Sequence, residues 1–174
     1  MGINPKHIVG AQLFIDDTGF IGLVDGLELP ENATKMIEHK ATGMIGAIEL
    51  PMSKEKATGK FKVQGLYEDL EKFFANAFAS RTIMIMASLA KYDASSGVSE
   101  EQAVVITMTG MFVKSKVGTI EAEKGTEGNC EYTVWAYKLV IAGTTLVEWD
   151  ILNNKFEVNG VDIIATRKSN MGVS

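Results

Sequence analysis

Hydrophobic and polar residues alternate or gather in short apolar runs along most of this chain, which is typical of β-strands. An apolar run over 8–15 ends at Asp16-Asp17-Thr18-Gly19, a turn sequence that predicts a β-hairpin. The next strand should run from Phe20 towards Leu29. Pro30 should end it, because proline has no N–H to donate to a sheet.

One segment changes from the strand period to the helical period. Residues 60–66 alternate between polar and apolar and predict a half-buried strand. Apolar residues then recur at helical spacing at Leu66, Leu70, Phe73, Phe74 and Ala77. We therefore expect one α-helix over about 66–78, with an apolar stripe that covers the open end or one face of a sheet.

The rest of the chain predicts further strands. They are expected over 82–92, 103–117, 131–141 and 145–153, with turns or loops over 93–101, 121–129 and 142–144 and at Asn153-Asn154 and Asn159-Gly160. Gly110, inside the longest of them, indicates a bulge or a close approach of two backbones. The order of strands, one helix, then more strands predicts a mainly β protein, an antiparallel β-sandwich or barrel, in a single domain over 1–174.

The stretch 31–58 is less regular and predicts an extended arm. Residues 34–39 could form a strand, whereas 41–52 is apolar, rich in glycine and flanked by charged residues. This second part is too short and too rich in glycine for a core helix, so we interpret it as an exposed loop or arm that needs a partner surface. Composition leaves open the alternative that it folds back on its own core. The candidate interface residues are Gly43, Met44, Ile45, Gly46, Ile48 and Leu50.

Charge and composition exclude several classes of protein. The 174 residues carry a formal net charge of −5 and no cluster of Lys and Arg, unlike proteins that wrap duplex DNA. A single cysteine excludes an intramolecular disulfide framework. The chain shows no signal peptide and no run of roughly 20 apolar residues. We expect it to fold in a cytoplasm without a membrane anchor.

A search for reactive groups yields no constellation that could carry a reaction. His7 and His39 are the only histidines and neither lies in a motif, while G-x-S-x-G and the phosphate-binding glycine motifs are absent. Two scattered histidines and one cysteine cannot supply a zinc site. Cys130 is better explained as a small buried residue on a strand than as a nucleophile. We therefore expect no enzymatic activity, no metal and no cofactor.

Three aromatic residues in the predicted strands allow two interpretations. Trp135, Tyr137 and Trp149 could form a platform on which bases stack. Such platforms carry interleaved basic residues, and here Lys138 alone is adjacent. Packing in the core is therefore the favoured interpretation.

The last third of the chain carries a recognisable pattern. It reads Leu146-Val147-Glu148-Trp149-Asp150, then Val158-Asn159-Gly160-Val161-Asp162, with Arg167, Asn170 and Gly172 near the end. This resembles the C-terminal signature of the major tail tube protein family of contractile-tailed (myovirus-type) bacteriophages and related R-type bacteriocins. Length and element order extend the resemblance over nearly the whole chain.

The resemblance implies a structural role. Such proteins form hexameric rings that stack into the inner tube of a contractile tail, the conduit for DNA delivery. The implied partners are other copies of the chain, the tail sheath protein, a baseplate or tube initiator, a tail terminator, a tape measure protein in the lumen, and DNA that passes non-specifically. The implied location is the virion tail or a phage-tail-like particle, assembled in the host cytoplasm.

The same resemblance points to two stacking segments. The arm is the first choice, and the C-terminal tail over 163–174, with Arg167, Asn170 and Met171, is the second. Two alternatives remain open. The chain could form the tube of an R-type bacteriocin or of a contractile injection or secretion system. It could also be a monomeric β-barrel that binds a small ligand, which predicts a closed apolar pocket and no self-assembly.

Overall fold

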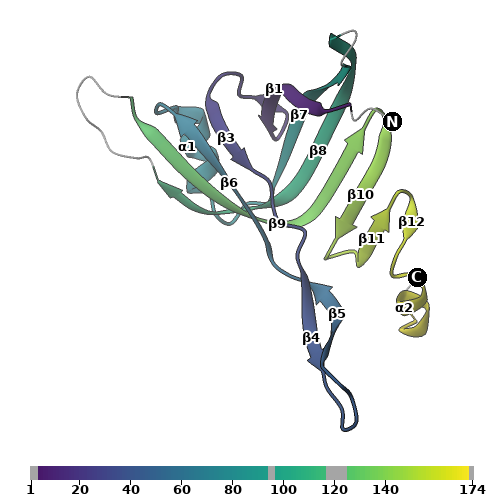
Figure 1. The fold of residues 1–174 in the computed structure, drawn as a ribbon. Helices are drawn as coiled ribbons and strands as arrows, with labels where there is room; N and C mark the ends of the chain where they lie inside the picture. Colours follow the sequence, from purple (N-terminus) through teal and green to yellow (C-terminus); the bar gives the residue numbers. More distant parts are fainter. Residues whose placement is uncertain (1–3, 94–96, 117–124, 173–174) are drawn as a thin grey trace.

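The computed structural model describes residues 4–93, 97–116 and 125–172. Ten strands form one antiparallel sheet with the main order β12-β11-β10-β9-β8-β7-β1-β2, and β6 and β3 extend it from β9 (Figure 1). Its strands are β1 (Lys6–Ile15), β2 (Thr18–Gly19), β3 (Val24–Glu28), β6 (Ala57–Gln64), β7 (Arg81–Asp93), β8 (Gly97–Lys116), β9 (Glu127–Ile141), β10 (Thr144–Asp150), β11 (Lys155–Val158) and β12 (Val161–Asp162). The predicted mainly β, antiparallel fold is confirmed.

The sheet divides along one edge of β9. The first half of β9 pairs with β6 and the second half with β10, while β8 pairs along the other edge. The register shifts at Thr109/Gly110, where a Cβ on Gly110 would lie 1.8 Å from the carbonyl oxygen of Thr133. Both features predicted for Gly110, the bulge and the close approach, are present. The long strands are curved, and the sheet forms an open, half-wrapped shell (Figure 1).

Helix α1 (Glu68–Ala75) lies against the end of this shell and closes its core. Leu70 and Phe74 of α1 are buried, and the Phe74 ring lies 5.5 Å from Phe61 and 5.1 Å from Phe112. The predicted helix is confirmed but is shorter than 66–78. Leu66 precedes it and is 57% exposed, because the chain turns before the helix begins.

Turn chemistry fixes the hairpins where the sequence predicts them. Asp16 and Asp17 have φ of 47° and 66°, and Asn159 and Gly160 have φ of 50° and 78°, the left-handed backbone that these residue types tolerate. The strand expected from Phe20 is shorter and begins at Val24. Phe20 instead turns into the core, and its N–H donates to a carbonyl of β1.

Several predicted boundaries are wrong. The loops expected over 93–101 and 121–129 are shorter, because β8 pairs with β7 from Gly97 and β9 pairs with β6 from Glu127. Residues 94–96 and 117–124 lie outside the described residues. A second helix, α2 (Ala165–Asn170), was not predicted. None of its six residues is buried, so it has no apolar stripe to detect. Among the described residues, no helix is long and apolar enough to cross a membrane.

The sequence predicted that Cys130 and the strand aromatic residues pack in the core, and the structure confirms this for most of these residues. Cys130 and Trp149 are buried, and Trp149 stacks on Tyr137 with ring centroids 5.8 Å apart. Burial raises the pKa of the Cys130 thiol to about 12, so it stays protonated and unreactive at neutral pH. Trp135 is half-buried, in β9 at the register shift.

Candidate assembly interface

The arm is a two-stranded hairpin that projects away from the main sheet (Figure 1). It consists of β4 (Thr34–His39) and β5 (Ile48–Lys54), which form a separate sheet. The strand expected over 34–39 is confirmed, whereas the loop expected over 41–52 becomes a strand from Ile48 onward. Nearly every residue of both strands is exposed, so the alternative that this segment folds back on its own core is wrong.

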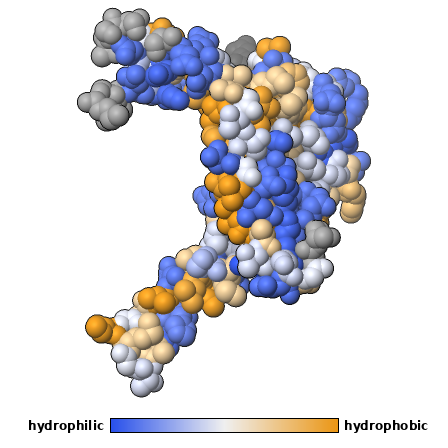
Figure 2. Space-filling view, turned by 90° about the vertical axis from the view of Figure 1, so that its right-hand side faces the viewer, coloured by the Kyte–Doolittle hydropathy of each residue, from blue (hydrophilic) through white to orange (hydrophobic). Residues whose placement is uncertain are grey.

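The two faces of the arm differ in chemistry. Ile37 pairs with Leu50, and Ile48 lies beside them on the same face. These three side chains are 41%, 40% and 49% exposed. Figure 2 shows hydrophobic residues on this projecting part of the molecule. The opposite face carries the pair Glu38 and Glu49 beside Met36 and Pro51.

The tip of the arm is also apolar. Met44 folds over the turn: its N–H donates to the Ala41 carbonyl at 3.1 Å, and the Ala41 N–H donates to Met44 Sδ at 3.3 Å. Gly43 has a φ of 92°, which a residue with a side chain rarely adopts. Ile45 is fully exposed, and nothing lies within 4 Å of a Cβ placed on Gly46. The candidate residues 43–46 therefore form one exposed apolar knob.

An isolated hairpin of this kind is marginally stable in water, and exposed apolar patches on soluble proteins mark contact surfaces. The sequence had identified Ile48 and Leu50 of the apolar face but missed Ile37. Ile37 belongs to the apolar face only because its strand pairs with 48–54, and the sequence does not reveal that pairing.

The second predicted segment, the C-terminal tail, meets the root of the arm. Arg167 Nη1 of α2 donates to the carbonyl of Met52 at 3.3 Å. The Lys54 ammonium lies 4.3 Å above the ring centroid of Phe156 in β11. A groove of about 410 Å³ lies between the two segments. Asn170 ends α2 and Met171 is 56% exposed, so neither joins Arg167 at the arm.

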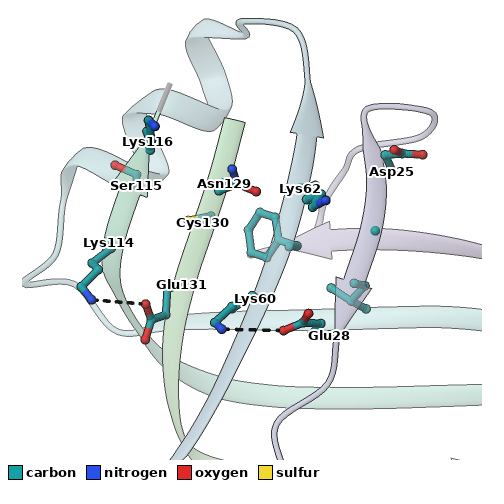
Figure 3. Close-up of a pocket in the computed structure, with 13 residues that line it drawn as sticks. Asp25, Glu28, Lys60, Lys62, Lys114, Ser115, Lys116, Asn129, Cys130 and Glu131 are labelled. Atoms are coloured by element: carbon teal, nitrogen blue, oxygen red, sulfur yellow. Dashed lines mark ion pairs between the residues drawn. The ribbon is translucent and has the colours of Figure 1, made fainter. Parts of the chain in front are cut away.

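A broad cleft over β3, β6, β8 and β9, of about 750 Å³, is a second exposed surface (Figure 3). One row of residues across these strands alternates in charge: Glu28, Lys60, Glu131 and Lys114 are successive register partners. Lys60 lies 3.9 Å from Glu28, and Lys114 lies 3.6 Å from Glu131. The charges of this row neutralise one another.

The neighbouring row has the same geometry but carries no acid. Gly26, Lys62, Asn129 and Lys116 are its register partners, so asparagine stands where the first row has Glu131. Within the part of the chain that the structure describes, neither Lys62 nor Lys116 has an ion-pair partner. We call this row the lysine rung.

Comparison with known proteins assigns the fold to a family. The model of the phage tail tube protein FII family matches residues 5–172. This chain belongs to that family. Its tail tube members are structural proteins of virions or tail-like particles, not enzymes. The tail tube protein of Escherichia phage P2 is 23% identical over 175 residues, which cover 97% of this chain and 98% of that protein.

Solved structures support the same tail tube fold. A chain of the sheath–tube complex of an extracellular contractile injection system, PVC, superposes with a TM-score of 0.54 at 8% identity, covering 75% of this chain and 86% of that one. A chain of the sheath/tube terminator of the same system gives a TM-score of 0.54 at 8% identity, covering 76% and 93%. Both are from the extended state.

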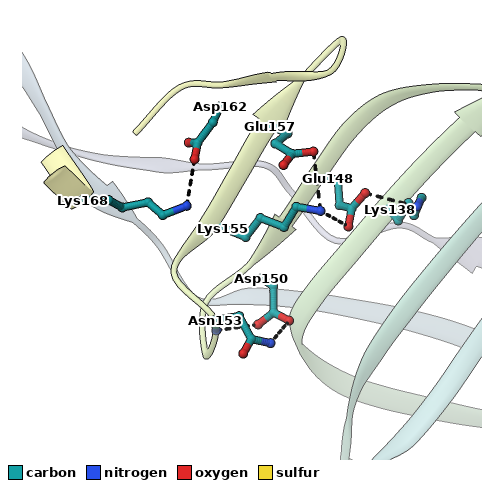
Figure 4. A network of polar contacts seen from close by, with 8 residues as sticks. All are labelled: Lys138, Glu148, Asp150, Asn153, Lys155, Glu157, Asp162 and Lys168. Atoms are coloured by element: carbon teal, nitrogen blue, oxygen red, sulfur yellow. Dashed lines mark hydrogen bonds and ion pairs between the residues drawn. The ribbon is translucent and has the colours of Figure 1, made fainter. Parts of the chain in front are cut away.

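In this tail tube protein, the C-terminal signature residues hold the last strands together (Figure 4). Glu148 accepts a hydrogen bond from Lys155 at 2.6 Å and lies 3.2 Å from Lys138. The Lys155 hydrogen bond is the main cause that holds the pKa of Glu148 below its ordinary value. Asp150 accepts hydrogen bonds from the backbone and side chain of Asn153 and so fixes the following turn.

Asp162 performs the same task for α2. Its carboxylate accepts the Ile164 N–H at 2.9 Å and the Lys168 ammonium at 2.8 Å. The Lys168 hydrogen bond lowers the pKa of Asp162. Asp162 thereby anchors the helix whose Arg167 donates to the Met52 carbonyl at the root of the arm.

Proposed function

We propose that this tail tube protein forms hexameric rings that stack into the inner tube of a contractile phage tail, the conduit for DNA delivery. The observation that supports it most is the projecting arm, whose exposed apolar side chains and apolar tip are not covered by any other described part of the chain. A contact from the arm of one copy to a different surface of the next is head-to-tail. Contacts of that type generate open filaments when they do not close.

Closure of each ring needs a second contact, and the free edge of β1 offers one. Among the described residues, β2 pairs with β1 at Phe14 and Ile15, and residues 6–12 have no strand on that side. Ile8 and Val9 on this edge are 58% and 51% exposed. Long exposed edges are an aggregation liability unless a partner uses them. In our proposal the neighbouring subunit of the ring pairs with this edge of β1.

The partners and the cargo follow from the same assembly. The outer wall of the tube would meet the sheath protein, and its ends a baseplate initiator and a terminator; the similar injection-system structures are named for sheath–tube and terminator assemblies. A tape measure protein would occupy the lumen during assembly. The net charge of −5 suits a channel that DNA traverses without sticking, because like charges repel phosphate.

A second candidate is a tube without a genome, as in an R-type bacteriocin or a contractile injection system. The similarity in fold to the PVC structures favours it, although 8% identity reflects the fold alone. Genes for a capsid and a terminase beside the gene for this protein would indicate a phage, and their absence an injection particle. The ligand-binding barrel is disfavoured by the family match.

Negative-stain electron microscopy of the purified protein over a range of concentrations, with its mass measured by light scattering, tests the proposal. Rings or hollow tubes with six-fold end views are expected. A particle with another rotational symmetry would overturn the hexamer. A species that stays monomeric both alone and on purified baseplates would overturn stacking altogether.

A further inference from the structure

The Glu38–Glu49 pair on the arm has no counterion among the described residues. Glu38 and Glu49 are directly opposite each other in the register of β4 and β5, and both are exposed. Like charges at directly opposed positions destabilise a hairpin. Among the described residues, neither carboxylate has a hydrogen bond or an ion pair. A cationic surface outside the arm would therefore stabilise it.

The lysine rung is the complementary surface. It carries two ammonium groups that have no ion-pair partner among the described residues, from Lys62 and Lys116, with the Asn129 amide between them (Figure 3). It cannot serve the arm of its own chain. The arm leaves the sheet at the start of β6, whereas Lys62 lies near the far end of β6, next to α1 (Figure 1). Opposite ends of one molecule are what head-to-tail contact between copies requires.

The two surfaces differ in spacing by an amount that lysine side chains can span. Side chains directly opposite in a hairpin have Cβ atoms roughly 5 Å apart. Lys62 and Lys116 are two strand spacings apart, roughly 9.5 Å at the backbone. Lysine side chains are long and flexible, so two ammonium groups can converge on a carboxylate pair. The Asn129 side chain can donate to an oxygen between them.

We propose that the arm of one copy docks across the lysine rung of a second copy, with Glu38 and Glu49 against Lys62 and Lys116. This rests on the proposed stacking and identifies the surface that receives the arm. Nucleic acid is a poorer occupant. Of the four lysines that line the cleft, Lys60 and Lys114 are already paired with acids, and two carboxylates match the remaining two lysines in number. Proteins that bind duplex DNA neutralise many phosphates with clustered Lys and Arg.

A charge exchange tests the contact. Glu38→Lys/Glu49→Lys and Lys62→Glu/Lys116→Glu should each raise the protein concentration needed for tubes by roughly tenfold or more, because like charges then meet. The two pairs combined in one chain should restore assembly, since the charges are opposite again. Glu68→Lys, at an exposed acid on α1, is the control and should leave the concentration unchanged. Equal loss in the combined variant would overturn the pairing.

A cross-link gives a readout that does not depend on tubes. Glu49→Cys in one preparation and Lys62→Cys in another should form a disulfide-linked dimer when mixed under mild oxidation. Native Cys130 is buried and does not compete. Glu68→Cys in place of Lys62→Cys should give none.

The outcomes separate this inference from the proposed function. If the two cysteine variants form tubes as the wild type does but give no disulfide-linked dimer, the docking is overturned and the proposed stacking is not. A cross-link without tubes or rings would support the docking and contradict the proposed tube. Binding of a DNA oligonucleotide that Lys62→Glu/Lys116→Glu abolishes, with tube growth unchanged, would overturn the docking in favour of a nucleic-acid surface.

Discussion

The apolar knob at the tip of the arm gives the sharpest separation between folding and assembly. Replacing Met44 and Ile45 by glutamate should leave the fold intact and prevent tube growth. Ile45 is fully exposed, and Met44 bonds only to the turn within the described structure. Substitutions at such sites usually change the free energy of unfolding by less than about 0.5 kcal/mol.

The expected loss of assembly follows from the area that the knob can bury. Burying a side chain such as methionine or isoleucine contributes about 1.5–3 kcal/mol. Ile45 starts fully exposed, so it can contribute close to that whole range. Since about 1.4 kcal/mol corresponds to a tenfold change in an equilibrium constant, loss of Ile45 should raise the critical concentration for tubes by roughly 10- to 100-fold. Glutamate adds the cost of desolvating a charge.

The assay measures the protein that remains soluble after tubes are pelleted, together with the urea midpoint of the unassembled chain. Met44→Ser/Ile45→Ser removes the apolar area without adding charge and should give the smaller of the two losses. Long tubes at the wild-type critical concentration would refute the assignment of the knob to the interface. A lower urea midpoint would show that these residues act on folding.

Three further predictions concern the sheet and the C-terminal helix. Gly110→Ala should destabilise the chain by about 3 kcal/mol, because its Cβ would lie 1.8 Å from a backbone oxygen, whereas Gly10→Ala, with nothing within 4 Å, should cost nothing in urea unfolding. Deleting 163–174 should lower the thermal midpoint little, since no residue of α2 is buried, but should lower the mass by light scattering because Arg167 no longer holds the arm. The Lys168 hydrogen bond lowers the pKa of Asp162 in the folded protein, so the contribution of this carboxylate is present at neutral pH and is lost as the pH falls through that lowered pKa. Hydrogen exchange of α2 should then accelerate, and Lys168→Ala should weaken this acid-dependent step, since the Ile164 N–H still bonds the carboxylate. Exchange that is unchanged by acid in the wild type would contradict the last prediction.

Local signals in the sequence were enough to predict the hairpins and the helix. The turn at Asp16-Asp17 and the turn at Asn159-Gly160 depend on residue types that tolerate positive φ, a property of the residues themselves. The helix was recognisable because Leu70 and Phe74 repeat at helical spacing and are the residues that become buried. Helix α2 could not be predicted in this way, because it has no buried residues and therefore no apolar repeat.

The sequence by itself determined the β class, helix α1 at the end of the sheet, the apolar character of 41–52 and the resemblance to tail tube proteins, because each depends on residues close together in the chain. Tertiary structure decided the rest. Residues 48–54 became a strand only by pairing with 34–39, which placed Ile37, Ile48 and Leu50 on one face and the Glu38–Glu49 pair on the other. The lysine rung exists because β6, β9 and β8 align Lys62, Asn129 and Lys116. Lys62 and Lys116 are more than fifty positions apart in the chain. Register between distant strands sets which charges meet, and no local pattern in a single sequence encodes that register.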